Sequence, residues 1–133
     1  RRLTREAGLS LVFLVAPTTT ETRARMITDA CSGFVYCISL KGVTGARTEL
    51  PTELRGQIER LRDLTDKPLA VGFGVSRPDQ ARQIAQFADG VIVGSQLVKL
   101  VGDSPDDPGR RARVLDFARS MQEAVQPTDQ PNR

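Results

Sequence analysis

Glycine and serine end two apolar segments in the C-terminal half of this chain. Residues 71–76 read VGFGVS, and residues 91–95 read VIVGS. A strand that ends in glycine exposes bare backbone N–H groups, and a helix that starts there adds a dipole favourable to an anion. Two such ends on neighbouring strands predict one shared phosphate cradle, of the kind that the last two β-α loops of a (β/α)8 barrel form.

The candidate ligands of this cradle are Gly72, Gly74, Gly94 and Ser95. The Ser95 hydroxyl can donate a hydrogen bond, and the N–H groups of Gly94 and Ser95 open a helical turn. One such turn alone is more often a tight connection and nothing else, but two on adjacent strands favour a ligand. The pattern is not the GxGxxG fingerprint, so a dinucleotide is disfavoured.

A long connection forms a second candidate. Residues 39–49 lie between an apolar segment and a helical pattern, and the stretch is longer than most β-α loops. Gly42 and Gly45 flank Thr44, which would let the loop fold over a bound substrate as a lid. Composition alone leaves the alternative of a tolerated surface loop open.

Tyr36 is the only tyrosine and lies in an apolar segment. Strand alternation puts it on the same face as Phe34 and Ile38. A lone tyrosine in a strand is most often part of a core, although the mouth of a barrel can supply a partner for its hydroxyl. No carboxylate ends an apolar segment, so the sequence shows no general acid–base pair.

Four apolar segments, each followed by a helical pattern, position these residues. The expected strands cover residues 11–15, 34–38, 69–73 and 90–93. Their spacing leaves room for the helical crossovers that parallel strands require. Such units form either a small open sheet or half of a barrel. A closed barrel takes about 250 residues, so the glycine-serine ends and the 133-residue length favour half a barrel.

The helix boundaries have their own signals. Gly8 is expected in the left-handed conformation after a first helix. Thr18 and Glu21 form a capping-box pattern, and Ser76 is expected to cap the helix after the third strand. We expect residues 1–126 to form one half-barrel and residues 127–133 to be a flexible tail.

Composition excludes several classes of function. The net charge is +3, with 19 basic and 16 acidic residues interspersed, so we expect a solvated surface and no nucleic-acid partner. No apolar stretch approaches a membrane span, and no signal peptide is visible. Cys31 and Cys37 form no CxxC pattern and histidine is absent, so we expect no metal site. Buried, reduced thiols in a cytoplasmic protein are the expected state.

Five motifs together resemble the tryptophan synthase α chain family. They are LVFLVAPTTT (11–20), GFVY (33–36), GVTGAR (42–47), VGFGVS (71–76) and ADGVIVGS (88–95). Their order and spacing agree over nearly the whole chain, and GVTGA after FVY is the most specific. The resemblance implies a TIM (β/α)8 barrel that splits indole-3-glycerol phosphate into indole and glyceraldehyde 3-phosphate by retro-aldol cleavage. It implies no cofactor of its own, and an αββα assembly with a β chain that carries pyridoxal phosphate and receives the indole.

The resemblance further implies that this chain is the fifth to eighth β-α units, the C-terminal half of the barrel. By position, the phosphate and its glycerol end would be held by Gly72, Phe73, Gly74, Gly94 and Ser95. The indole pocket would be bordered by Leu14, Tyr36 and Ile92, and Thr44 would lie on the closing lid. Tyr36 and Thr44 would support catalysis. The main catalytic Glu and Asp of the family belong to the half that this sequence does not contain, so the fragment alone is expected to be inactive.

Two other interpretations remain. The nearest is another phosphate-binding TIM-barrel enzyme, against which the GVTGA loop argues. The other is a non-catalytic half-barrel that serves in binding or assembly. A strand ending in Glu, encoded upstream of this sequence, would favour the enzyme.

Overall fold

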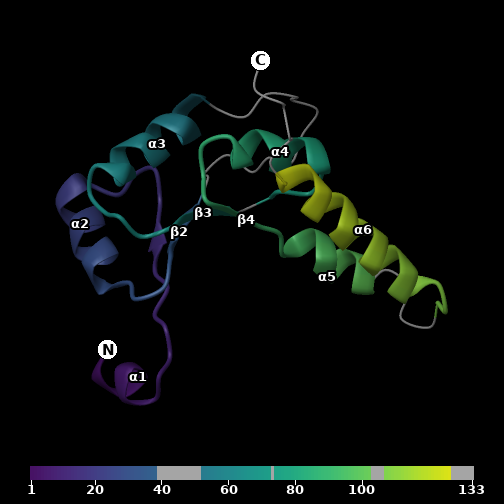
Figure 1. The fold of residues 1–133 in the computed structure, drawn as a ribbon, viewed down its shortest axis with the longest axis horizontal. Helices are drawn as coiled ribbons and strands as arrows, with labels where there is room; N and C mark the ends of the chain where they lie inside the picture. The colour runs from purple at the N-terminus through teal and green to yellow at the C-terminus, as the bar shows by residue number, and fades with distance from the viewer. Residues whose placement is uncertain (39–51, 73, 103–106, 127–133) are drawn as a thin grey trace.

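The computed structural model describes residues 1–38, 52–72, 74–102 and 107–126 (Figure 1). Helices and strands alternate along this part of the chain up to its last strand, as the sequence predicts, and two helices follow that strand. In order they are α1 (Arg2–Glu6), β1 (Leu14–Val15), α2 (Glu21–Ala30), β2 (Val35–Ile38), α3 (Thr52–Arg62), β3 (Leu69–Gly72), α4 (Pro78–Ala85), β4 (Gly90–Ile92), α5 (Ser95–Gly102) and α6 (Arg110–Val125). The long loop that was expected to form a lid, Phe73 and the expected tail all lie outside the described residues.

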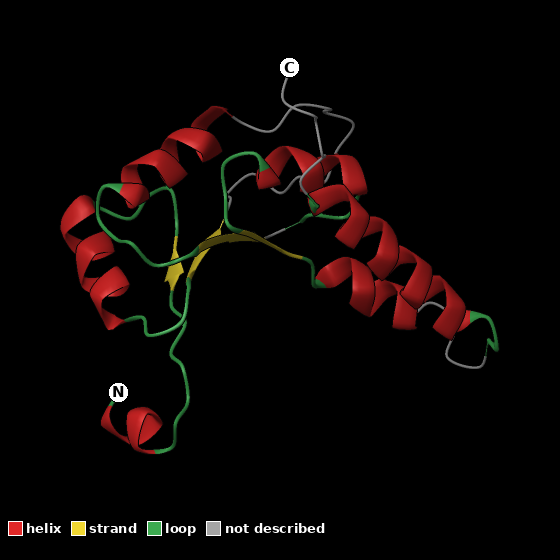
Figure 2. Ribbon diagram, in the orientation of Figure 1, coloured by secondary structure: helices red, strands yellow, loops and turns green. Residues whose placement is uncertain are grey.

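The strands form one parallel sheet in the order β1-β2-β3-β4 (Figure 2). Leu14 pairs with Tyr36, Tyr36 with Ala70, and Ala70 with Gly90, so these four residues form one row across the sheet. The order follows the chain, as expected when each crossover helix leads to the adjacent strand. The fold prediction of parallel β-α units is confirmed.

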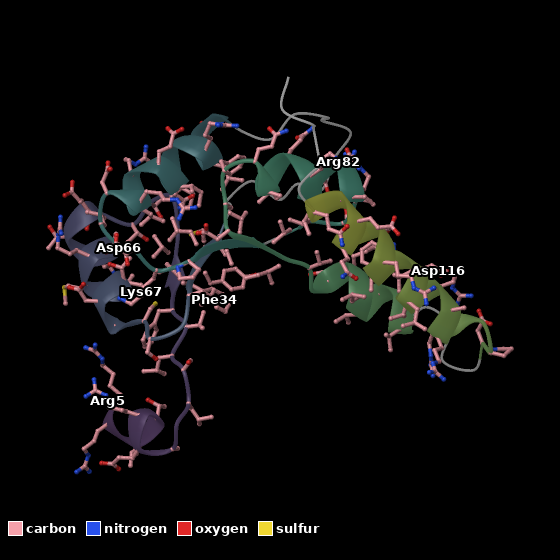
Figure 3. All side chains as sticks on the ribbon, viewed as in Figure 1. Arg5, Phe34, Asp66, Lys67, Arg82 and Asp116 are labelled. Atoms are coloured by element: carbon pink, nitrogen blue, oxygen red, sulfur yellow. The ribbon has the colours of Figure 1, made fainter. Side chains whose placement is uncertain are left out.

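The core lies between the sheet and the helices. Val15, Val35, Cys37, Leu69 and Val71 are buried, and they share one hydrophobic cluster with residues from α2, α3, α4 and α6. Figure 1 shows α2, α3 and α4 as an arc along one side of the sheet. The outward surfaces of the helices are polar; Arg82 on α4 and Asp116 on α6 are exposed (Figure 3).

The opposite face of the sheet alternates with the buried one and lacks a helical cover among the described residues. Leu14 is 55% exposed, and Tyr36, Ile38 and Ile92 are half-buried. Parallel sheets normally have both faces covered. These four apolar side chains, which we call the inner face, therefore lack the cover that a complete barrel would supply.

An ion pair joins helix α3 to the amino end of the sheet. Arg62, the last residue of α3, lies 2.7 Å from the Asp89 carboxylate, measured between Nη1 and Oδ2. The same carboxylate oxygen accepts a hydrogen bond from Leu69 N–H at 2.8 Å. The hydrogen bond from Arg62 is the main reason that the pKa of Asp89 is lowered. A single side chain thus joins α3, β3 and the start of β4.

Three local expectations are wrong. The first strand is shorter than residues 11–15 because it lies at the sheet edge, where Leu11 and Phe13 accept only isolated bonds from Ser32, Gly33 and Tyr36. The Thr18–Glu21 capping box is absent, since the N-cap of α2 is Thr20. In its place, the Thr19 hydroxyl accepts a hydrogen bond from Ala16 N–H at 3.0 Å.

The third correction concerns Ser76. Helix α4 starts at Pro78 with Arg77 as its N-cap, so Ser76 is not the cap. Gln80 stabilises the start of the helix from its third position. Its Oε1 accepts hydrogen bonds from Ser76 N–H at 3.0 Å and from Arg77 N–H at 3.1 Å, just ahead of the helix. At the start of the chain, Gly8 does adopt the expected left-handed conformation, with φ of 68°.

Candidate functional site

The two glycine-rich strand ends lie side by side. β3 ends at Gly72 and β4 ends at Ile92, and these two residues are paired in the sheet. The chain then turns through Gly74, whose φ of 80° is a conformation that side-chain-bearing residues rarely adopt. The two strand ends of the expected cradle therefore lie next to each other at the carboxyl end of the sheet.

Helix α5 begins at this end of the sheet. Its first residue is Ser95, and both Gly94 and Ser95 are exposed. A Cβ atom added at Gly94 would have no heavy atom within 4 Å, so open space surrounds this position. The first N–H groups of a helix have no partner inside the helix. An anion approaching the strand ends would meet these groups without a side chain in its path.

Tyr36 lies over Gly72. A Cβ atom built on Gly72 would collide with the Tyr36 hydroxyl oxygen and would lie 2.6 Å from Tyr36 Cζ. It would also lie 3.0 Å from Ile92 Cβ. The ring of Tyr36 therefore reaches across β3 towards β4, and only glycine leaves room for it. Leu14 is the register neighbour of Tyr36 on the other side, at the open edge of the sheet.

The structure thus brings together most of the residues singled out in the sequence. Tyr36, Gly72 and Ile92 lie close together on the inner face, and Leu14 pairs with Tyr36 in the neighbouring strand. Gly94 and Ser95 follow directly after β4. Phe73 and Thr44 fall outside the described residues, so their proposed roles remain predictions.

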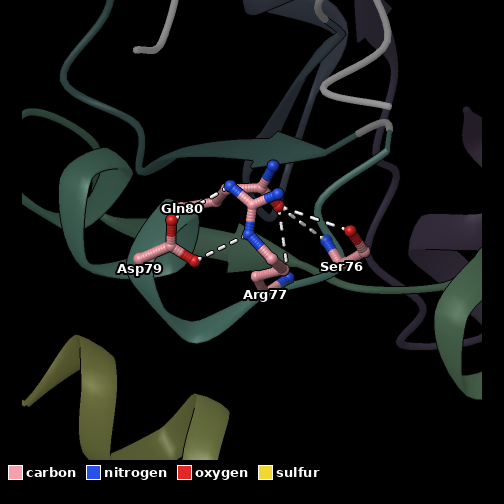
Figure 4. Close-up of polar contacts among 4 residues, drawn as sticks. All are labelled: Ser76, Arg77, Asp79 and Gln80. Carbon is pink, nitrogen blue, oxygen red and sulfur yellow. Dashed lines mark hydrogen bonds and ion pairs between the residues drawn. The ribbon is translucent and has the colours of Figure 1, made fainter. Parts of the chain in front are cut away.

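A polar network holds the turn that follows β3 (Figure 4). Arg77 binds Asp79 through two hydrogen bonds, Nε to Oδ1 and Nη2 to Oδ2, both 3.0 Å long. This contact lowers the pKa of Asp79 below its ordinary value. Gln80 is buried and binds the backbone on the other side of the turn. The sequence signal for this network was weak, because Gln at the third helical position is only one half of a capping box.

Cysteine chemistry and metal binding find no support in the described residues. Cys31 and Cys37 are free and buried, as expected for structural thiols. Burial raises the pKa of Cys37 to about 12, which keeps it in the unreactive thiol form. Nowhere in the described ranges do three or more His, Cys, Asp or Glu side chains gather as metal ligands. None of the helices described is long and apolar enough to cross a membrane.

One cavity of about 260 Å³ lies away from the cradle, between the β1–α2 connection and α3. Sequence reasoning did not single out Gln57, which lines it. Gln57 is 3% exposed, and its Nε2 donates to the Val15 carbonyl at 3.3 Å. Its Oε1 has no hydrogen-bond partner within the described part of the chain. The space is large enough for ordered water to satisfy that atom.

Comparison with known proteins agrees with this arrangement. The family model described as tryptophan synthase alpha chain matches residues 1–126. The tryptophan synthase alpha chain of Dehalococcoides mccartyi is 43% identical over 121 residues, which cover 91% of this chain and 46% of that protein. The Roseiflexus castenholzii protein of the same name is 48% identical over 118 residues, which cover 88% of this chain and 44% of that protein.

A solved structure gives the same result in three dimensions. A chain of the tryptophan synthase a2b2 complex from Pyrococcus furiosus superposes with a TM-score of 0.76 and 38% identity, covering 93% of this chain and 48% of that one. The chain spans less than half the length of the curated relatives described above. Its four parallel strands correspond to about half of the TIM barrel of these relatives. This chain therefore belongs to the tryptophan synthase alpha chain family.

Proposed function

We propose that this chain is the phosphate-binding half of an enzyme that cleaves indole-3-glycerol phosphate into indole and glyceraldehyde 3-phosphate. The observation that carries the proposal is the pairing of Gly72 with Ile92, which puts two glycine-rich strand ends beside the first residues of α5. Membership in the tryptophan synthase alpha chain family supports the choice of substrate.

In this proposal the phosphate lies between residues 72–74 and Gly94–Ser95. Backbone N–H groups at the start of α5 donate to its oxygens, and the helix dipole favours its charge. Phe73 is assigned to the same cradle by the resemblance to the family alone. The absence of side chains at Gly94 matters most, because the open space there lets the anion reach the backbone.

The indole ring would lie on the inner face. Leu14, Tyr36 and Ile92 offer apolar surface there, and the Tyr36 hydroxyl offers a hydrogen bond near Gly72. Thr44 would close over the substrate from the loop before α3. Excluding water in this way strengthens every electrostatic interaction in the site.

The cleavage itself needs an acid and a base. A base removes the proton of the side-chain hydroxyl as the carbon–carbon bond breaks, and an acid protonates the indole carbon that receives the electron pair. Two carboxylates of the described part, Asp79 and Asp89, are held by Arg77 and Arg62, with their pKa values lowered. Both carboxylates are thus held in ion pairs, and we assign the acid and base to the other half of the barrel, as the resemblance to the family implies.

The proposal extends to partners. The Pyrococcus furiosus relative was solved as part of an a2b2 complex. We propose an equivalent αββα assembly in the cytoplasm, in which indole passes to a β chain that carries pyridoxal phosphate. The proposed cleavage of indole-3-glycerol phosphate requires proton transfers alone, so we assign this chain no cofactor.

The cradle is tested by replacing Gly94 with valine in the full-length enzyme. A β-branched side chain would fill the space through which the anion approaches. We expect affinity for glycerol 3-phosphate, measured by calorimetry, to fall by at least about tenfold, a loss of about 1.4 kcal/mol.

Gly102→Val is the matched control. Gly102 ends the same helix, and a Cβ atom there also has open space around it. The affinity of the Gly102→Val variant for glycerol 3-phosphate should equal that of the parent enzyme. Unchanged affinity in Gly94→Val would show that the phosphate binds elsewhere.

A further inference from the structure

Gln80 is a buried polar side chain close in sequence to the candidate phosphate cradle. It is 2% exposed and lies on the same buried side of α4 as Ala81 and Ile84, which are part of the hydrophobic core. A buried amide destabilises a protein unless its polar atoms are hydrogen-bonded. The core therefore fixes where the Gln80 side chain lies, and its hydrogen bonds fix whatever they reach.

The Gln80 amide oxygen holds two successive backbone groups of the turn between β3 and α4 (Figure 4). Ser76 N–H donates to Oε1 at 3.0 Å, and Arg77 N–H donates to the same atom at 3.1 Å. Val75, the residue before them, is 3% exposed and belongs to the same core. Three successive residues thus anchor the helical side of this turn.

Gly74 lies between this anchor and the sheet. On the strand side, Gly72 is held by its pairing with Ile92. Gly74 itself has a φ of 80°, in a region that glycine enters freely but need not occupy. Its conformation therefore depends on the fixed points on either side. Releasing the helical side would let the Gly74 backbone rotate and would move the groups that this turn offers to a phosphate.

The start of α4 is already supplied with acceptors of its own. Arg77 N–H is bound by Gln80, and Pro78, the first residue of the helix, has no N–H. Backbone N–H groups of the first turn contribute to the lowered pKa of Asp79, whose carboxylate therefore lies at this helix start. That negative charge disfavours a second anion there. The turn can serve a phosphate at the start of α5 only through the position of its backbone.

We propose that Gln80 is a positioning residue of the phosphate cradle, which holds Gly74 in its left-handed conformation through the N–H groups of Ser76 and Arg77. The inference rests on the proposed phosphate site and adds to it a residue that does not touch the phosphate. Its physical basis is preorganisation, because apparent affinity falls with the fraction of molecules in the binding conformation. A turn that keeps this conformation about one tenth of the time binds about tenfold more weakly.

The test removes the acceptor from the full-length enzyme. Gln80→Leu should weaken the binding of glycerol 3-phosphate, measured by calorimetry, by about tenfold. Circular dichroism establishes that the variant is folded at the temperature of the titration. Gln80→Met, unbranched and close to glutamine in length, repeats the measurement with a smaller change of shape and should show the same loss.

Gln57→Leu is the matched control, since it makes the same substitution at the other buried glutamine of the described part. Gln57 is 3% exposed, and its Nε2 donates to the Val15 carbonyl, away from the cradle. This variant should lose stability and keep the parent affinity for glycerol 3-phosphate. Gln80→Glu keeps a carboxylate oxygen for the two N–H groups, as glutamate does at this position of a capping box, and should restore the affinity.

Gly94→Val distinguishes failure of this inference from failure of the proposed function. Weaker binding in Gly94→Val with parent-like binding in Gln80→Leu would overturn the role of Gln80 and leave the cradle in place. Parent-like binding in both variants would overturn both proposals. An equal loss in Gln57→Leu, or a Gln80→Glu variant that binds as weakly as Gln80→Leu, would show general destabilisation and would also overturn the positioning role.

Discussion

At the scale of single residues, Gly72 and Tyr36 form the most constrained contact of the candidate site. Tyr36 crosses β3 so closely that a methyl group on Gly72 would meet its hydroxyl and lie 2.6 Å from Cζ. We expect Gly72→Ala to destabilise the chain by about 1–3 kcal/mol, the usual cost of overpacking. Chemical unfolding monitored by circular dichroism measures the change.

Gly90→Ala is the control for this prediction. Gly90 lies in the neighbouring strand, but its added Cβ would be 3.4 Å from Ala70 Cβ, an ordinary contact. The double variant Gly72→Ala with Tyr36→Leu should recover much of the lost stability, because the shorter side chain no longer crosses the added methyl. Independent, additive effects would mean that the two residues do not touch.

Single residues also show where sequence reasoning reaches its limit. The glycines at the strand ends were identifiable, since their type alone implies an exposed backbone. The collision between Tyr36 and Gly72 was not, because it depends on the register between β2 and β3. Gln57 was missed for a related reason: nothing in its helical context marks a polar residue that is to be buried, with an Oε1 that has no partner among the described residues.

At the scale of elements, the strands follow from continuous apolar runs, which parallel sheets require. Their ends were less predictable. β1 is shorter than predicted because, among the described residues, it pairs on one side only, with β2. The start of α4 was misplaced because serine is a common cap, whereas the structure uses a glutamine four residues later.

The capping role of Gln80 gives a prediction at this scale. Gln80→Leu would leave Ser76 N–H and Arg77 N–H without their acceptor. An abandoned hydrogen-bonding group costs about 1–3 kcal/mol when buried, and this turn is half-buried, so we expect the lower part of that range. Thermal unfolding of the variant measures the loss.

Ser76→Ala is the comparison that distinguishes stabilisation of this turn by Gln80 from capping of the helix by Ser76. The only described hydrogen bond of the Ser76 hydroxyl is a long one of 3.5 Å to Gln80 Oε1, so its removal should change stability by less than about 0.5 kcal/mol. If serine were the cap, the ranking would be reversed, with Ser76→Ala the more damaging of the two.

At the scale of the whole molecule, strand direction and order followed from the alternation of apolar runs and helices. The uncovered inner face was also foreseeable, since the chain carries strands for half a barrel and apolar side chains on both faces. The complete site was not foreseeable, because cradle and acid–base pair are assigned to different halves. In our proposal, phosphate binding belongs to the paired strand ends of this chain, and the acid and base that bond cleavage needs are assigned to the other half of the barrel.

This division of labour leads to a last prediction, on activity. The purified 133-residue chain should release no indole from indole-3-glycerol phosphate. The phosphate cradle alone supplies neither the acid nor the base, which we assign to the other half of the barrel. An indole-release assay on the chain, with the full-length enzyme as the positive control, decides the point. Indole release by the chain alone, abolished by Gly94→Val, would contradict the assignment of acid and base to the other half while leaving the phosphate cradle in place.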